Sequence, residues 1–139
     1  MDYSQLTKSR LEHNKFAQML GIQISEITLG AAKGFIEIKP EHMNAIHSVH
    51  GGCLFTLADI VGAAAAASYG EHITTLDCSI HYLKAGLNST SIYADAKVIK
   101  HGKKVTVTEV SITDQDDTLL TTAVLTFMSL GKPVEKPLN

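Results

Sequence analysis

Apolar and polar residues alternate along much of the chain, which is the pattern of β-strands with one buried face. In residues 32–39, for example, Ile36 and Ile38 alternate with Glu37 and Lys39. Glycines, prolines and polar clusters separate the alternating segments and predict the turns between them. The alternation predicts strands at residues 22–29, 32–39, 72–83, 89–100, 104–113 and 119–128.

The apolar parity changes within one of these strands, from Val105 and Val107 to Val110 and Ile112. An extra residue in an antiparallel pair produces such a shift, so we predict a β-bulge near Thr108. The strand at 72–83 is predicted to present one face with Leu76, Cys78, Ile80 and Tyr82, and the other with Thr75, Asp77, Ser79 and His81.

Two segments lack the alternation and favour helices. Residues 3–20 carry apolar side chains among charges and predict an N-terminal helix that ends at Gly21. The run from Gly51 to Ala67 is rich in alanine, and Asp59 is its only charge. A helix that is apolar all round must be enclosed. We therefore predict an α+β fold in which one antiparallel curved sheet wraps around a long central helix.

Length and composition fit one folded domain. The chain has 139 residues, of which 45% are apolar and 19% charged, which excludes a disordered chain. We expect a single domain over residues 1–139, with the N-terminal helix at about 3–20, the core at about 22–129 and a loose tail at 130–139.

The charge balance gives no sign of a nucleic-acid or membrane partner, because 12 Lys and Arg face 14 Asp and Glu. Cys53 and Cys78 lack the CxxC spacing of a redox or zinc site. The polar N-terminus is unlike a secretory signal, so we expect a cytoplasmic protein.

Candidate chemistry gathers at the central helix. Asp59 places a carboxylate on an apolar helix, where burial of a charge is costly, and this suggests a functional role. A structurally paired or solvent-facing Asp also fits the pattern. Gly51 and Gly52 would let a ligand approach bare N–H groups at the positive end of the helix, or serve only as a turn. Asn44 and His50 precede the helix and could position a water or a carbonyl, or cap the loop.

Two further clusters have more ordinary explanations. His42, His47 and His50 are spaced unlike any common zinc site, so we expect no metal there. A hairpin turn carries three lysines that could contact phosphates or simply be solvated, namely Lys100, Lys103 and Lys104.

Taken together, the segments 41–46, 50–52 and 57–59 resemble the signature of hot-dog-fold acyl-CoA thioesterases, with its Asn…His-Gly-Gly…Asp spacing. The phenylacetate-degradation (PaaI-like) group is the most similar type. The resemblance extends to residues 75–83 and 98–103, and it covers roughly residues 12 to 130.

The resemblance implies a role for each matching residue. Asp59 matches a carboxylate that acts as general base or nucleophile, and Gly51 matches the glycine whose N–H polarises the thioester carbonyl. Asn44 matches an amide that orients water or substrate, and His50 shapes the loop beside it. Thr75 falls where relatives often carry a hydroxyl near the carboxylate.

The resemblance also implies a substrate and an assembly. The CoA is part of the substrate, and neither a metal nor another cofactor is expected. We expect Gly52 to line the substrate site, and Lys100, Lys103 and Lys104 to meet the CoA phosphates. Relatives commonly carry Gly where this chain has His47, so the imidazole narrows the acyl site in this interpretation. Tetramers, as dimers of dimers, are usual in the family.

Helix geometry favours a shared site. Gly51 and Asp59 are eight positions apart, about 12 Å along one helix. An oxyanion donor and a base must both lie within about 3 Å of the reacting groups. Two antiparallel copies of the helix would satisfy this at a two-fold interface.

Three functions follow from this interpretation. The first is hydrolysis of an acyl-CoA to a free acid and CoA. The alternative is a non-catalytic acyl-CoA-binding or sensor domain, which would have no need of a base. A dehydratase or hydratase of the same fold would need a His/acid pair in motifs that the sequence lacks.

Overall fold

A computed structural model describes residues 1–138 of the chain. The strands form one antiparallel sheet in the order β1-β2-β4-β5-β6-β3. The elements are α1 (Tyr3–Glu12), α2 (Lys15–Met19), β1 (Gln23–Thr28), β2 (Ala31–Glu37), a 3₁₀ turn (Pro40–His42), α3 (Gly51–Ala67), β3 (Glu71–Tyr82), β4 (Ser91–His101), β5 (Val105–Asp114) and β6 (Leu119–Pro133).

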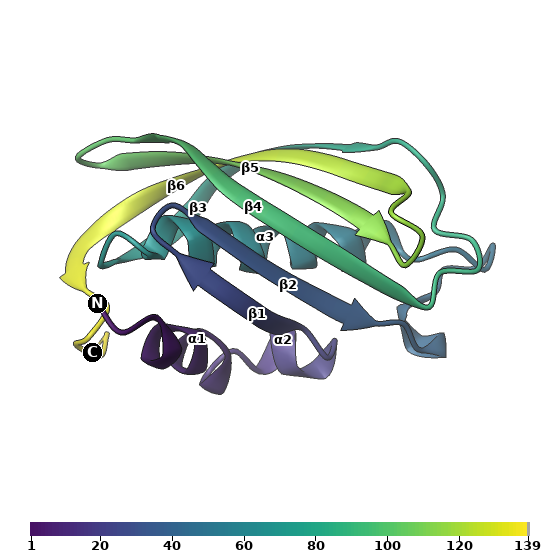
Figure 1. Ribbon diagram of the computed structural model, residues 1–139, viewed down its shortest axis with the longest axis horizontal. Coiled ribbons are helices and arrows are strands. Elements are labelled where there is room, and N and C mark those ends of the chain that lie inside the picture. Colours follow the sequence, from purple (N-terminus) through teal and green to yellow (C-terminus); the bar gives the residue numbers. More distant parts are fainter. Residues whose placement is uncertain (139) are drawn as a thin grey trace.

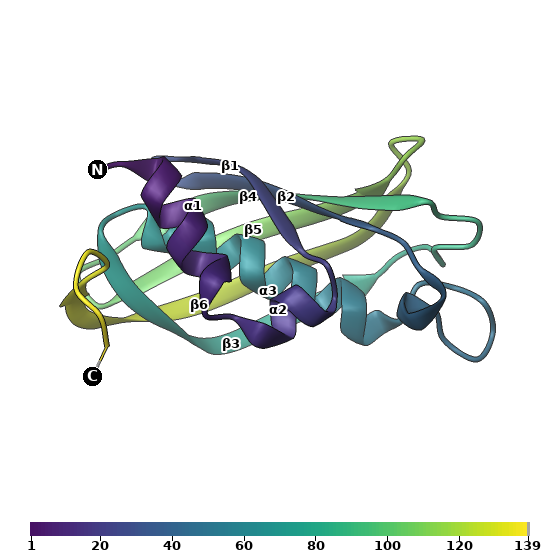
Figure 2. The ribbon, with the colours of Figure 1, turned by 90° about the horizontal axis from the view of Figure 1, so that it is seen from below.

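The sheet curves over α3, as the sequence predicts (Figure 1). Helices α1 and α2 lie on the side of α3 that faces away from β4, β5 and β6 (Figure 2). The central helix is therefore covered on two sides, which explains why it needs no polar face.

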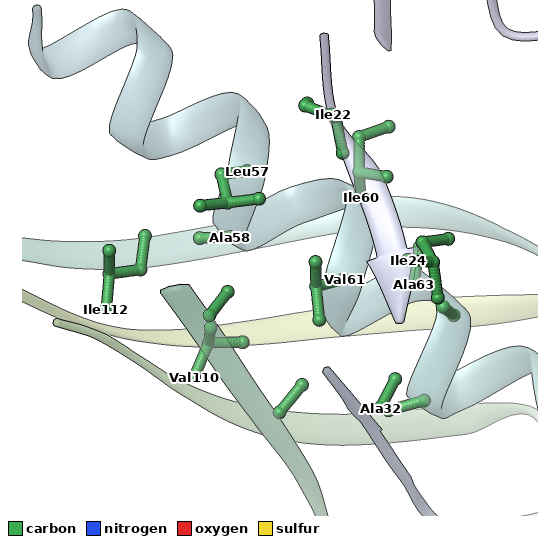
Figure 3. Packing of buried hydrophobic residues seen from close by; sticks show 14 of the residues in the cluster. Ile22, Ile24, Ala32, Leu57, Ala58, Ile60, Val61, Ala63, Val110 and Ile112 are labelled. Carbon is green, nitrogen blue, oxygen red and sulfur yellow. The ribbon is translucent and has the colours of Figure 1, made fainter. Parts of the chain in front are cut away.

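Apolar side chains of α3 interlock with those of the sheet. Leu57, Ala58 and Val61 are fully buried and face Val110 and Ile112 of β5 (Figure 3). The second half of the helix is a run of buried alanines, residues 63–67. Alanine is the best helix former and adds little bulk, so the helix backbone lies close to the strands.

The predicted helix at 3–20 is divided into α1 and α2. The break lies at His13 and Asn14, where Asn14 caps α2 by accepting a hydrogen bond from the Ala17 N–H at 3.1 Å. An Asn side chain competes for backbone donors in this way and favours a helix start over a helix interior.

Strand β5 keeps a single parity, which corrects the expected switch. Thr106 and Thr108 fill core positions, and Thr108 is 0% exposed. The bulge lies in β4 instead, where Ile99 is the extra residue opposite Thr108. Threonine is β-branched and packs much like valine, so its hydroxyl conceals a core position from a pattern based on polarity.

The tail expected to be loose from residue 130 is partly structured. Strand β6 continues to Pro133, and the Val134 N–H donates to the Gly70 carbonyl at 2.9 Å. The Val134 side chain also packs against the core. The prediction is therefore wrong for residues 130–134, and Asn139 lies outside the described residues.

Strand β3 forms one edge of the sheet, and much of both its faces is exposed. Leu76 and Tyr82 are about half exposed, at 53% and 50%. A long edge with apolar side chains is a surface that other chains pair with. Among residues 1–138, no helix has both the length and the apolar character required to cross a membrane.

Candidate active site

The first turn of α3 leaves one backbone donor free. The Gly52 N–H donates to Nδ1 of His50 at 2.8 Å, and the N–H groups of Cys53 and Leu54 donate to the His50 carbonyl. Within residues 1–138, the Gly51 N–H has no acceptor. It lies at the positive end of the helix dipole, so this turn presents a single donor to a carbonyl oxygen or an anion.

Asn44 holds the loop that leads into this turn. Its Oδ1 accepts hydrogen bonds from the N–H groups of Ile46 and Ser48 at 3.1 and 3.0 Å, and its Nδ2 donates to the Ser48 hydroxyl at 2.8 Å. His47 has φ of 62° in this loop, a conformation that glycine adopts most readily. The loop-capping interpretation of Asn44 is therefore realised, while a second N–H of its amide remains for another acceptor.

Asp59 lies two turns further along α3 and is half-buried. The Thr75 hydroxyl of β3 donates to its carboxylate at 2.7 Å. Asp59 shares one helix face with Gly52 and Phe55, and neither of these is buried. The carboxylate is therefore held by the edge strand and reaches a surface that the chain itself does not cover.

A bulge in β3 brings two side chains to α3. Thr75 and Asp77 pair with consecutive residues of β6, so Leu76 is the extra residue. Thr75 therefore faces α3 together with Tyr82, whose hydroxyl donates to the Gly51 carbonyl at 3.0 Å. The predicted separation of Thr75 and Tyr82 onto opposite faces is wrong, because a bulge resets the alternation.

Two ionisable side chains, Arg10 and Cys78, lie near enough to Asp59 to respond to its charge. Burial lowers the pKa of the Arg10 guanidinium on α1, and the nearby Asp59 carboxylate opposes this change. Burial raises the pKa of the Cys78 thiol, and the carboxylates of Asp59 and Asp77 raise it further. Arg10 is thus a cationic neighbour of the carboxylate that comes from the N-terminal helix.

The single chain does not bring the free Gly51 N–H and the Asp59 carboxylate together. Tyr82 meets Gly51 and Thr75 meets Asp59, at two points along the same helix. Eight positions of α-helix separate Gly51 from Asp59 by about 12 Å. A single chain therefore holds Gly51 and Asp59 at two separate points of α3.

A model of the family described as the thioesterase superfamily matches residues 47–121, more than half of the chain. The chain belongs to the thioesterase superfamily. A relative named acyl-coenzyme A thioesterase PaaI, from Escherichia coli, is 33% identical over 75% of this chain and 74% of its own length. A putative esterase of Archaeoglobus fulgidus is 36% identical over 67% of this chain, which spans only 60% of that relative.

A solved structure supports the same family and the hot-dog fold. The E. coli PaaI protein from the phenylacetic acid degradation operon has a TM-score of 0.89 with this chain, and the two share 27% identity. The match covers 94% of this chain and 95% of that one. The resemblance and the fold predicted from the sequence are both confirmed.

In this thioesterase-superfamily chain, the three lysines lie apart from the α3 residues. Lys100, Lys103 and Lys104 line a hollow of about 430 Å³ at the turn between β4 and β5, together with Val105 and Val107. The structure therefore groups the lysines as the sequence predicts, on a different surface from Asp59.

The loop histidines have separate partners. His42 is buried, with Nδ1 accepting from the Lys39 N–H and Nε2 at 2.8 Å from the Leu20 carbonyl. His50 caps α3, and His47 is exposed. Over residues 1–138, no group of His, Cys, Asp and Glu side chains is arranged to hold a metal ion.

Three residues near the site were not singled out from the sequence. Tyr82 and Ser48 contact Gly51 and Asn44, and Arg10 neighbours Asp59. The end of β3 at His81 and Tyr82 belongs to the segment that resembles the family, and this resemblance was a usable signal for Tyr82. Arg10 comes close through tertiary packing, which no local pattern encodes.

Proposed function

We propose that the chain hydrolyses acyl-CoA thioesters to a free acid and CoA. The unpaired Gly51 N–H carries this proposal, because its first-turn neighbours are all engaged. A lone preorganised donor at a helix N-terminus suits the oxyanion that develops in thioester hydrolysis. The name of the E. coli relative supports CoA thioesters as the substrate class.

In this mechanism, Asp59 acts on water. The carboxylate takes a proton from a water molecule as the water oxygen bonds to the thioester carbon. The carbonyl oxygen becomes an oxyanion at the Gly51 N–H. When the C–S bond breaks, CoA leaves as a thiolate and takes the proton that Asp59 had accepted from water. This step regenerates the Asp59 carboxylate and leaves the free acid as the second product. Direct attack by Asp59 on the carbonyl would pass through an anhydride, which water then cleaves.

The surrounding residues orient these two groups. Thr75 fixes one oxygen of the Asp59 carboxylate and leaves the other for water. His50 keeps the Gly52 N–H occupied, and Tyr82 holds the Gly51 carbonyl. Asn44 holds the loop and has one amide N–H left to orient water or substrate. Gly52 allows the substrate to approach the backbone.

The proposed active unit is a two-fold dimer. Gly51 and Asp59 lie about 12 Å apart along one helix, whereas an antiparallel partner helix would bring its Asp59 to Gly51. The exposed β3 edge and the uncovered face of α3 offer a continuous surface for that partner. A dimer of two such dimers fits the family expectation.

Mixed dimers test the shared site. Asp59→Ala alone should lower kcat at least about a hundredfold, because a general base contributes that much. Asp59→Ala subunits mixed with Asn44→Ala subunits form one intact site per mixed dimer and regain part of the activity. Self-contained sites would regain none. Asp95→Ala, an exposed carboxylate on β4, is the matched control.

The same experiment decides between the enzyme and a binding or sensor domain. Release of free CoA thiol from an acyl-CoA by the wild type supports the enzyme. Tight binding of the thioester without thiol release would support the sensor and contradict the role of Asp59.

We also propose that Lys100, Lys103 and Lys104 bind the CoA phosphates in their hollow. Lys103→Ala should then raise KM and weaken its dependence on salt, because a phosphate contact is lost. Lys97→Ala, on the same strand as Lys100 but outside the hollow, is the control. A KM that changes neither with salt concentration nor in Lys103→Ala would contradict this part of the proposal.

A further inference from the structure

A hollow of about 720 Å³ lies between α1, the start of β3 and the segment that follows β6. Its lining has a strong charge bias, because no Asp or Glu among residues 1–138 contributes to it. The cationic or ionisable side chains that line it are Arg10, His13, Lys15, His72 and Lys136. Such a lining suits an anion.

Arg10 is the most constrained member of this set. Its Nε is buried and has no hydrogen-bond partner among residues 1–138. A buried guanidinium N–H is normally paired, since leaving it unpaired is costly. The His72 ring lies 2.7 Å from the Lys136 carbonyl, a contact that joins β3 to the segment after β6. Among residues 1–138, no carboxylate lies within salt-bridge distance of the Arg10 guanidinium, so its charge remains for a ligand in the hollow that it lines.

The hollow lies beside the acid half of the proposed active site. His72 precedes Thr75 by three residues, about 10 Å of strand, and Thr75 binds Asp59. Three residues of β3 therefore lie in order along α3. Tyr82 binds Gly51 at the start of the helix, Thr75 binds Asp59 in its middle, and His72 lines the hollow. A thioester carbonyl at Asp59 could thus extend its acyl chain toward Arg10, away from Gly51 of the same protomer.

We propose that this hollow binds the anionic end of the acyl group, so that the preferred substrates are CoA thioesters of dicarboxylic acids. This inference rests on the proposed thioesterase function. A terminal carboxylate matches the fork of donors that a guanidinium offers, and the histidines and lysines add positive charge. The CoA phosphates have their own candidate surface at Lys103, at the turn between β4 and β5.

Adipoyl-CoA and hexanoyl-CoA provide a matched test, because they differ only in the terminal carboxylate. We expect the wild type to favour adipoyl-CoA about tenfold or more in kcat/KM. In Arg10→Gln the ratio should fall to about one, whereas Arg10→Lys should retain part of the preference because it keeps the charge. Lys8→Gln removes a charge from the exposed side of α1 outside the hollow and should leave the ratio unchanged.

The outcomes separate this inference from the thioesterase itself. Hydrolysis of hexanoyl-CoA with no preference for adipoyl-CoA overturns the anion site and leaves the thioesterase intact. An equal loss of both rates in Arg10→Gln also overturns it, because Arg10 would then act only through Asp59. If neither thioester is hydrolysed, the proposed function fails, and calorimetry with adipate and hexanoate decides whether the hollow binds the dicarboxylate.

A second pair of variants guards against a folding defect. If circular dichroism shows that Arg10→Gln does not fold, His72→Gln and Lys136→Gln take its place in the same assay. Both residues line the hollow, where His72 is half-buried and Lys136 is exposed. A reduced adipoyl preference in either variant supports the inference, and an unchanged preference in both contradicts it.

Discussion

The Thr75 hydroxyl donates to the Asp59 carboxylate at 2.7 Å, and this bond joins the edge strand to the central helix. The bond exists because Leu76 bulges out of β3 and turns Thr75 toward α3. It fixes the direction of a carboxylate that the apolar helix would otherwise leave to rotate.

We predict that Thr75→Val lowers kcat about tenfold, because the isosteric change removes one hydrogen bond to a charged group. Thr75→Ser should stay close to the wild type, since it keeps the hydroxyl. Steady-state release of CoA thiol measures both variants. Equal rates for Val and Ser at this position would contradict a positioning role for the hydroxyl.

A side chain larger than that of Gly34 in β2 is predicted to destabilise the fold. A Cβ there would lie 2.6 Å from the Gln23 carbonyl oxygen and 2.7 Å from Cγ2 of Val61. Gly34→Ala should therefore lower the free energy of unfolding by about 1–3 kcal/mol, the usual cost of overpacking. Urea denaturation measures this, with Lys33→Ala on the same strand as the exposed control. An unchanged midpoint would show that the sheet relaxes freely.

The Cys53 thiol is predicted to be unreactive in the folded protein. Burial raises the pKa of this thiol from 9.0 to about 11, so the thiol is protonated at neutral and mildly alkaline pH. Only the thiolate reacts with alkylating reagents. Mass spectrometry after iodoacetamide treatment at pH 8 should find Cys53 unmodified unless urea is present. Rapid labelling of the native protein at this position would contradict the burial.

The same raised pKa predicts a stability change at high pH. The unfolded chain releases the Cys53 proton near pH 9, whereas the folded chain keeps it to about 11. The protonated Cys53 thiol therefore makes its full contribution to the free energy of unfolding below pH 9. That contribution, about 2–3 kcal/mol, is lost between pH 9 and 11. Cys53→Ala should flatten the fall of unfolding free energy across that interval. A wild-type profile no steeper than that of the variant would oppose this assignment.

His47 is predicted to respond to backbone shape more than to side-chain chemistry. Its φ of 62° is strained for most residues, and strain is greatest for β-branched ones. His47→Val should lower the free energy of unfolding by about 1–2 kcal/mol, whereas His47→Gly should change it little. Ile46→Val, at the exposed neighbouring position, is the control. A thermal shift equal in both valine variants would argue against strain at His47.

The sequence predicts the elements of this fold well because each element follows an apolar period. The strands and the enclosed helix α3 lie where the alternation and the alanine run place them. The errors have local causes. Asn14 starts a second helix, and Thr108 is a polar residue at a core position. The bulges at Leu76 and Ile99 shift the alternation of inward-facing and outward-facing side chains in β3 and β4.

The candidate site is less accessible from the sequence. The resemblance to thioesterases points to Asp59, Thr75 and Gly51, and the structure joins the first two. The contact of Tyr82 with Gly51 depends on a bulge, and the approach of Arg10 to Asp59 depends on how α1 packs. Such relationships arise from tertiary structure, and no residue spacing encodes them.

The alanine run of α3 couples the position of Asp59 to the packing of the helix against the sheet. The small side chains of residues 63–67 allow the helix to lie close to the sheet, and Asp59 belongs to the same helix. One larger side chain in this run would tilt α3 and move the Asp59 carboxylate away from Thr75. A substitution one to two turns along the helix would therefore change the environment of Asp59 without altering Asp59 or Thr75 themselves.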